Sequence, residues 1–199
     1  MIAYMIKIPG TPRIKKALQI LKKRLAASSL ILMYHRVADV KIDPWSLCVT
    51  PKHFSEHLEV LQKFAYTLRL DRLTHSLRLG KIPRRSVVIT FDDGYADNLH
   101  TAKPLLERND IPATFFLTTG CIERHREFWW DELDRFLLQP AILPEILKLS
   151  ISGKIYEWHL NSDVQCNKDI IHQNSSWRAW EKAPGIRNEI YYSLWKLLK

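Results

Sequence analysis

SVVITFDDGY, residues Ser86–Tyr95, is an apolar run that ends abruptly in two adjacent carboxylates, a glycine and a tyrosine. The nearly continuous run Val87–Phe91 predicts a strand buried on both faces, as in parallel sheets, where Val/Ile runs replace simple alternation. Asp92 and Asp93 then fall at the carboxyl end of that strand, the edge at which α/β folds build their sites. Because adjacent side chains at a strand end point in different directions, one carboxylate can bind a metal while the other faces a substrate. Gly94 allows a tight turn after them.

A plain turn is the alternative interpretation of these residues, because Asp-Gly pairs are common in turns. Two carboxylates directly behind a buried strand favour a site instead. Like charges at an apolar edge destabilise the fold unless a cation or a proton compensates them.

The sequence on both sides of this strand alternates between strand and helix patterns. Further strands are predicted at Leu30–Val37, as the first core strand, and at Tyr66–Leu70 and Ala113–Thr118, the last with the same buried character. Helices are predicted from Pro51 to about Ala65 behind a capping Thr50, near Leu73–Leu79, and from about Ala96 to Arg108. This alternation predicts an α/β fold with βαβ units, a parallel sheet and right-handed crossovers.

Two helices carry more detailed expectations. In the first, Phe54, Leu58 and Leu61 mark the buried stripe, so His53 and His57, one helical turn apart, are expected beside it at the surface. In the helix that follows the Asp pair, Leu99, Leu105 and Leu106 are expected to face inward, and Pro104 predicts a kink or a late start.

The alternation stops near residue 119. A helix is predicted at Phe128–Gln139 with Trp129, Leu133, Phe136 and Leu137 on one side, a β-hairpin at Leu147–Leu160, a polar loop at Asn161–Ser176 and an amphipathic helix at Ile186–Leu198. Core packing is the preferred interpretation of Trp129 and Trp130. The predicted organisation is a basic amphipathic helix within 1–28, the α/β part at 29–120, and an inserted or appended helix and hairpin subdomain at 121–199.

The chain of 199 residues has a formal net charge of +9, and its distribution matters more than its size. Residues 1–36 carry eight lysines and arginines and no acid, which leaves +1 for the rest. Basicity therefore belongs to the N-terminal arm, and a nucleic-acid-binding function is not expected. Within the arm, residues 12–27 form the amphipathic pattern. Packing on the body is the preferred interpretation, and peripheral contact with an anionic membrane is the alternative.

The sequence also indicates a compartment. No apolar stretch approaches the roughly 18–20 residues of a membrane-spanning helix, and the N-terminus lacks a secretory signal pattern. Three cysteines without CxxC spacing argue against a disulfide framework and a cysteine zinc site, and they suit a reducing compartment. A cytoplasmic location is therefore expected.

The string TFDDGYADN, residues 90–98, resembles the first motif of the polysaccharide deacetylase family, which includes the NodB-type chitooligosaccharide deacetylases. LILMYHRV upstream, at residues 30–37, and PATFF downstream, at 112–116, resemble the family as well. The resemblance covers roughly Leu30 to Thr119. It implies a partial distorted (β/α) barrel of the NodB-homology type, with Asp92 as general base and Asp93 as metal ligand.

The activity implied by this resemblance is metal-dependent hydrolysis of the C–N bond in an N-acetylated carbohydrate, with zinc as the favoured divalent metal. His35 at the end of the first strand and Tyr95 after the Asp pair are candidate substrate-binding residues. The family also uses an H-[ST]-x-x-H motif for two metal ligands. Only His100, His125, His159 and His172 follow the Asp pair here, and no two have that spacing.

Three hypotheses follow. The leading one is that the chain is the N-terminal portion of a longer deacetylase, with little or no activity alone. The second is a non-catalytic binding or assembly module that retains half of the fold, with no bound metal. The third is a magnesium-dependent phosphohydrolase, which needs oxygen ligands only. Neither a Gly-rich phosphate loop nor a second acidic motif supports the third.

Overall fold

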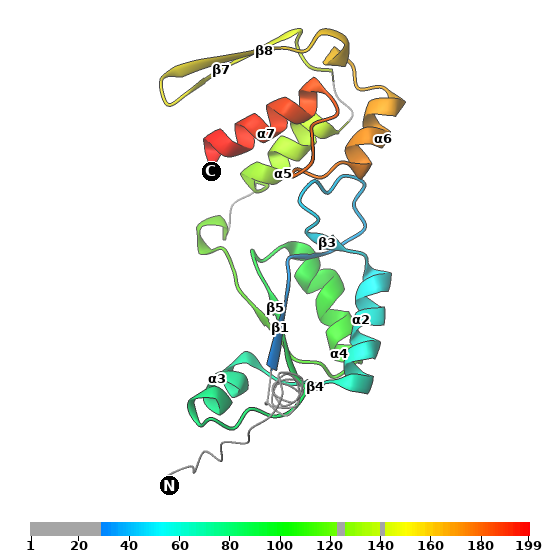
Figure 1. Cartoon of the computed structure of the whole chain (residues 1–199), viewed down its shortest axis with the longest axis vertical. Helices are drawn as coiled ribbons and strands as arrows, with labels where there is room; N and C mark the ends of the chain where they lie inside the picture. The colour runs from blue at the N-terminus through cyan, green and yellow to red at the C-terminus, as the bar shows by residue number, and fades with distance from the viewer. Residues whose placement is uncertain (1–28, 123–125, 140–141) are drawn as a thin grey trace, which may run out of the picture.

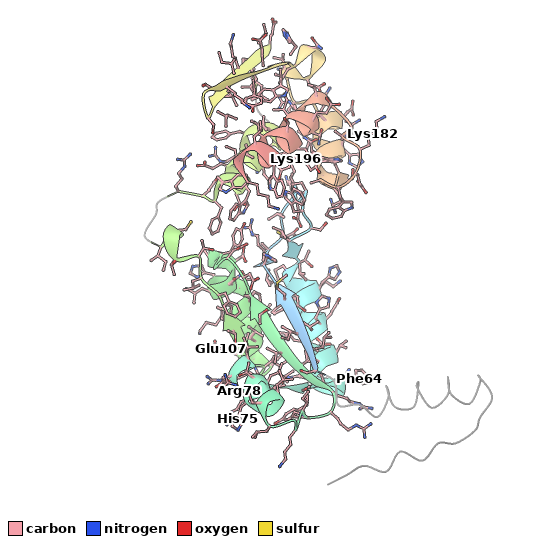
Figure 2. All side chains as sticks on the ribbon, turned by 60° about the vertical axis from the view of Figure 1, so that its left-hand side comes forward. Phe64, His75, Arg78, Glu107, Lys182 and Lys196 are labelled. Atoms are coloured by element: carbon pink, nitrogen blue, oxygen red, sulfur yellow. The ribbon has the colours of Figure 1, made fainter. Side chains whose placement is uncertain are left out.

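The computed structural model describes residues 29–122, 126–139 and 142–199. Elements up to β6 lie in one part of an elongated molecule, and those from α5 onward lie in the other (Figure 1). Figure 2 shows Phe64, His75, Arg78 and Glu107 on the first part and Lys182 and Lys196 on the second. The basic helix predicted for residues 12–27 lies outside the described residues. Within the described residues, no helix is long and apolar enough to cross a membrane.

A parallel sheet organises the first part. β5 (Ser86–Phe91) is central and pairs along its whole length with β1 (Ser29–Tyr34). Its other side is shared by two short strands. β4 (Tyr66–Thr67) pairs with its amino-terminal end, and β6 (Ala113–Phe115) pairs with its carboxyl-terminal half. All six residues of β5 are buried, which confirms the strand predicted from the apolar run.

Three helices accompany this sheet, and α2 and α4 lie together on one of its faces (Figure 1). They are α2 (Pro51–Phe64), α3 (Leu70–Arg78) and α4 (Lys103–Arg108). The Thr50 side chain caps α2, and the predicted Phe54, Leu58 and Leu61 are its buried residues, so that helix is confirmed. The first hydrophobic core lies between α2, α4 and β5. His57 lies at its margin, where its Nδ1 is 3.1 Å from the hydroxyl of Tyr34.

Three predictions for this part are wrong in detail. Leu99 is 57% exposed, because the helix after the Asp pair opens with a wider π-helical segment, Asn98–Ala102, before α4 begins with Pro104 in its first turn. Ala113–Thr118 is not a buried strand, since Phe115, Phe116 and Leu117 are exposed. Likewise Leu30, Ile31 and Met33 of β1 are more than half exposed. β1 and β6 are edge strands, each paired with β5 on one side only.

The second part packs helices and a hairpin around its own core. Its elements are α5 (Trp129–Leu133), the π-helical segment η3 (Asp134–Leu138), β7 (Ile146–Ile151), β8 (Lys154–His159), the 3-10 turn η4 (Asn161–Val164), α6 (Lys168–Ser176) and α7 (Ile186–Leu198). β7 and β8 form an antiparallel hairpin that turns at Ser152 and Gly153, both with positive φ. The helix predicted at 186–198 is present as α7.

Two expectations for the second part are wrong. Phe136 is half exposed, whereas Leu133 and Leu137 are buried. The stretch 161–176, predicted as a loop, contains η4 and α6. A polar anchor explains this miss: buried Asn174 of α6 donates to the carbonyl of Leu138 at 2.8 Å and accepts from Asn188 at 3.0 Å. Hydrogen bonds, not an apolar stripe, fix this helix.

One loop connects the two cores. β2 (Arg36–Val37) and β3 (Cys48–Val49) form a short parallel pair, and residues 38–47 between them extend to the second core. There the indole of Trp45 donates to the hydroxyl of Tyr191 at 2.8 Å and packs 4.4 Å from the ring of Trp195. This loop therefore brings the carboxyl end of β1 close to the second part.

Candidate functional site at the carboxyl edge of the sheet

The candidate residues gather where β1 and β5 end. The two strands are paired in register up to Tyr34 and Phe91, so His35 and Asp92 follow at the same level. The backbone N–H of Asp92 donates to the carbonyl of Tyr34 at 2.9 Å. The pairing thus continues one residue past the strand ends. It places His35, after β1, beside Asp92, after β5.

The Asp pair lies in a tight turn whose backbone conformation is unusual. Asp93 has φ = 68° and Gly94 has φ = 77°, both in the left-handed region that favours glycine. The N–H of Gly94 donates back to the carbonyl of Asp92 at 2.9 Å, and the N–H of Thr118 donates to the carbonyl of Asp93 at 3.3 Å. The turn therefore redirects the chain immediately after Asp92.

His35 and Asp93 are brought together at this edge. The imidazole Nε2 lies 3.9 Å from a carboxylate oxygen of Asp93, and the two side chains are 23% and 28% exposed. Asp92 is partly exposed, and its carboxylate makes no hydrogen bond or ion pair with the described residues. A partly exposed carboxylate without a partner is available for proton transfer.

Tyr95 occupies a different environment. It is only 8% exposed, and its hydroxyl accepts a hydrogen bond from the indole of Trp130 at 2.7 Å. Burial raises the pKa of the Tyr95 phenol above its ordinary value. The hydroxyl is therefore already engaged, and the ring remains as the part of Tyr95 that a ligand could contact.

Behind these residues lies a charged network that the sequence did not reveal. The guanidinium of Arg36 pairs with Asp97 at 2.9 Å, lies 3.9 Å from Asp131 and stacks 4.5 Å from the ring centre of Tyr95. Burial opposes the charge of Arg36, but the hydrogen bond to Asp97 and the nearby carboxylates outweigh it, so the guanidinium pKa lies above its ordinary value. Burial also raises the pKa of Asp131, against the hydrogen bond from Tyr95 and the charge of Arg36.

Asp97 and Asn98 fix the backbone that carries His35. Asp97 accepts the backbone N–H of Val37 at 3.1 Å, and Asn98 donates to the carbonyl of His35 at 2.8 Å. Both residues lie within the motif at 90–98, so adjacency to the Asp pair was a signal for them. No sequence signal pointed to Asp131, because it is distant from the motif in sequence.

A large cleft opens beside this edge, between the sheet and the helix that begins at Trp129. Its volume is about 1060 Å³, and Arg36, Gly94, Tyr95 and Asp97 form the sheet side of its lining. Asp92, Asp93 and His35 are not among its lining residues. A second groove of about 520 Å³ lies along β4 and β6, and it contains none of the candidate residues.

The fit of these residues to a metal can be tested on their geometry. Two donors bound about 2.1 Å from one tetrahedral ion lie roughly 3.4 Å apart, so 3.9 Å between His35 and Asp93 is close to what a shared cation requires. Catalytic zinc sites use three protein ligands. The described residues contain no group of three or more His, Cys, Asp or Glu side chains that could hold a metal ion. They supply two donors and do not form a complete metal site.

Comparison with known proteins agrees with the motif. The polysaccharide deacetylase family model matches residues 80–148. A Bacillus subtilis (strain 168) protein named as a polysaccharide deacetylase, YxkH, is 36% identical over 115 residues, which are 52% of this chain and 40% of that protein. The poly-beta-1,6-N-acetyl-D-glucosamine N-deacetylase of Staphylococcus aureus (strain MSSA476) is 31% identical over 106 residues, 47% of this chain and 37% of that protein.

Solved structures give a weaker likeness. The Streptococcus pyogenes deacetylase PplD in complex with acetate has a TM-score of 0.44 at 25% identity, over 53% of this chain and 50% of that one. IcaB from Ammonifex degensii has a TM-score of 0.44 at 23% identity, over 55% and 48%. The matched segment spans about two fifths of the length of the curated relatives. Over residues 80–148, which contain Asp92 and Asp93, this chain matches the polysaccharide deacetylase family model and is similar to a partial region of that family.

Proposed function

We propose that this chain carries part of a metal-dependent carbohydrate deacetylase, which hydrolyses the C–N bond of an N-acetylated sugar. The observation that carries the proposal is the approach of His35 to Asp93 at 3.9 Å, beside the unpartnered carboxylate of Asp92. The Staphylococcus aureus relative named for poly-beta-1,6-N-acetyl-D-glucosamine supports an N-acetylated glycan as the substrate class.

Each of the three residues has a role in this proposal. Amide hydrolysis needs a base that takes a proton from the attacking water and an acid that protonates the leaving nitrogen. Asp92 has a free carboxylate and serves as the base. His35, whose imidazole lies beside Asp93, binds the substrate. Asp93, whose carboxylate lies 3.9 Å from the imidazole of His35, serves as a metal ligand.

The metal requirement limits what the chain does alone. Asp93 and His35 are two donors, and a catalytic zinc ion takes three protein ligands. A divalent metal, with zinc favoured, needs further donors beyond the two found among the described residues. We therefore propose little or no turnover by this chain alone. The same shortfall supports a second candidate function, a non-catalytic binding or assembly module.

Metal binding tests the ligand roles directly. Isothermal titration of the full chain with Zn²⁺ should show weak binding that is lost in Asp93→Ala and weakened in His35→Ala. His75→Ala is the matched control, because His75 is exposed on α3, which lies near the opposite end of the sheet (Figure 1), and it should bind like the wild type. Equal binding by wild type and Asp93→Ala would contradict the ligand role.

Turnover is the second measurement. Acetate release from an N-acetylated oligosaccharide should be undetectable with the Zn²⁺-loaded chain alone. Turnover that Asp92→Asn abolishes would confirm the deacetylase activity and the base, and it would refute the proposed dependence on further donors. Turnover that persists in Asp92→Asn would refute the role of Asp92.

A further inference from the structure

One segment of residues 37–199 is strongly basic, although that range as a whole has a net charge of only +1. Residues 63–85 carry seven lysines and arginines and a single acid, Asp71, which is a net charge of +6. Residues 37–62 and 86–199 together carry −5. The positive charge of the chain is therefore not confined to the N-terminal arm, because a second basic segment is hidden in the average.

The fold places this second segment at the amino edge of the parallel sheet. It runs from the end of α2 through β4 and α3 to the start of β5, and the N–H of Tyr66 donates to the carbonyl of Arg85 at 2.9 Å. Figure 2 shows Phe64 and Arg78 at the end of the molecule that is remote from the second part. We call residues 63–85 at this end of the sheet the basic edge.

The N-terminal arm joins the sheet at the same end. Ser29, the first residue of β1, is paired with Ser86, the first residue of β5. Residues 1–28 carry seven lysines and arginines and no acid. The chain therefore brings its two basic segments to one edge of the sheet, and the second adds to the charge of the first.

Most cations of the basic edge lack a carboxylate partner. Arg69 pairs with Asp71 at 3.1 Å, and both side chains are exposed. Five others are exposed and form no ion pair with any residue in 29–122, 126–139 or 142–199: Lys63, Arg78, Lys81, Arg84 and Arg85. Cations that the protein itself does not neutralise attract an anionic partner.

Large apolar side chains are exposed among these cations. Phe64 is 67% exposed, Tyr66 59%, Leu77 51% and Leu79 58%. This combination suits an anionic membrane surface, where cations contact lipid headgroups and apolar side chains enter the boundary with the acyl chains. Nucleic acid would engage the cations but would leave Leu77 and Leu79 without an apolar environment.

We propose that the basic edge is a peripheral contact surface for an anionic lipid bilayer. It lies at the opposite end of β5 from Asp92 and Asp93, and the six residues of that strand separate the two ends by roughly 17–20 Å. Binding through the basic edge therefore leaves the candidate site uncovered. The inference does not depend on the proposed function, because it uses none of the residues of that site.

Cosedimentation with lipid vesicles tests the inference. The full chain should bind vesicles of phosphatidylcholine and phosphatidylglycerol in equal amounts and should not bind vesicles of phosphatidylcholine alone. Each Lys or Arg near an anionic bilayer contributes roughly fivefold in affinity. The variant Arg84→Gln/Arg85→Gln should therefore weaken binding by about tenfold or more. Phe64→Ser/Leu79→Ser, which keeps the charge, should weaken it by about threefold or more, because apolar insertion is lost.

A matched double variant controls for the loss of net charge. Lys168→Gln/Lys182→Gln removes two exposed lysines from the second part, which lies remote from the basic edge (Figure 1 and Figure 2). It should bind the mixed vesicles like the wild type. Thermal unfolding of all three variants establishes that each is folded.

Four results would overturn the inference. Wild-type binding by Arg84→Gln/Arg85→Gln would assign the contact to residues 1–28 alone. Equal losses in that variant and in Lys168→Gln/Lys182→Gln would show that net charge, and not this surface, governs binding. Wild-type binding by Phe64→Ser/Leu79→Ser would refute a lipid contact. Binding to duplex DNA without binding to the mixed vesicles would make nucleic acid the partner.

Discussion

The indole nitrogen of Trp130 donates a hydrogen bond of 2.7 Å to the hydroxyl of Tyr95. The two residues are 35 positions apart, one in the turn after the Asp pair and the other on α5 of the second part. The ring of Tyr95 lies under the guanidinium of Arg36, which is 3.9 Å from the carboxylate of Asp131. One phenol thus joins the edge of the sheet to the helix across the cleft.

Tyr95→Phe should destabilise the protein by about 1–3 kcal/mol, because the part-buried indole N–H of Trp130 loses its acceptor while the ring stays in place. Urea unfolding followed by circular dichroism measures the difference. Tyr66→Phe is the control, since Tyr66 is 59% exposed and its hydroxyl makes no hydrogen bond with the described residues. Equal stability of the Tyr95→Phe and wild-type proteins would show that this bond does not hold the two parts together.

Gly94→Ala should destabilise the fold more than Gly80→Ala does. Both glycines have positive φ, 77° and 63°, so both substitutions incur backbone strain of about 1–2 kcal/mol. A Cβ on Gly94 would also lie 2.8 Å from the side chain and 3.3 Å from the Cα of Leu117, whereas one on Gly80 meets nothing within 4 Å. Thermal unfolding of the two variants measures the difference. Adding Leu117→Ala to Gly94→Ala should restore part of the loss, and no gain would show that backbone strain alone is responsible.

The parts of the fold that were predicted correctly are those specified by local sequence. The apolar run Val87–Phe91 predicted β5. The capping Thr50 and the apolar stripe at Phe54, Leu58 and Leu61 predicted α2. Asp92 and Asp93 were placed at the strand end for the same reason. The left-handed backbone at Asp93 was not predicted, because Gly94 accounted for the turn without it.

The parts that were missed depend on contacts between distant segments. The exposure of Phe115 and Leu117 follows from the position of β6 at a sheet edge, which no local pattern encodes. The helix α6 depends on buried Asn174 and a carbonyl 36 residues away. Asp131 approaches Arg36 from a segment 95 residues further along the chain, so the network behind the site could not be read from either stretch.

Asp134 should make the stability of the protein fall as the pH rises through neutrality. Burial raises the pKa of Asp134 to about 7 from an ordinary 3.8; the charges of Asp131 and Asp43 add to this, and a hydrogen bond with Tyr191 and the charge of Arg36 oppose it. The folded protein therefore binds this proton more tightly than the unfolded chain. The stabilisation by the protonated Asp134 is complete below about pH 4. It is lost as the pH rises to about 7, where Asp134 ionises in the folded protein.

Replacing Asp134 with Asn removes that titration. The free energy of unfolding of Asp134→Asn, relative to wild type, should rise between pH 4.5 and 7.5 by about 2 kcal/mol, less than the shift alone implies because the site is partly open to solvent. Urea unfolding at several pH values measures it. Asp39→Asn, which replaces an exposed aspartate in the connecting loop 38–47, should leave the pH dependence unchanged. A constant difference between Asp134→Asn and wild type across this range would contradict the raised pKa.

Asn98→Ala should disturb His35 although the two side chains do not touch. Asn98 is 3% exposed, and its amide donates to the carbonyl of His35 at 2.8 Å and to Asp97 at 3.1 Å. Removing it leaves a buried carbonyl without its donor, which should cost about 1–3 kcal/mol and release the backbone that carries the imidazole. The measurements are urea unfolding and the imidazole resonances of His35 in NMR spectra. Asn109→Ala is the matched control, because its amide also donates to a carbonyl at 2.8 Å, that of Leu105 in α4, away from the site. Both variants should lose stability, but only Asn98→Ala should shift the His35 resonances; a shift in both, or in neither, would show that Asn98 does not position His35.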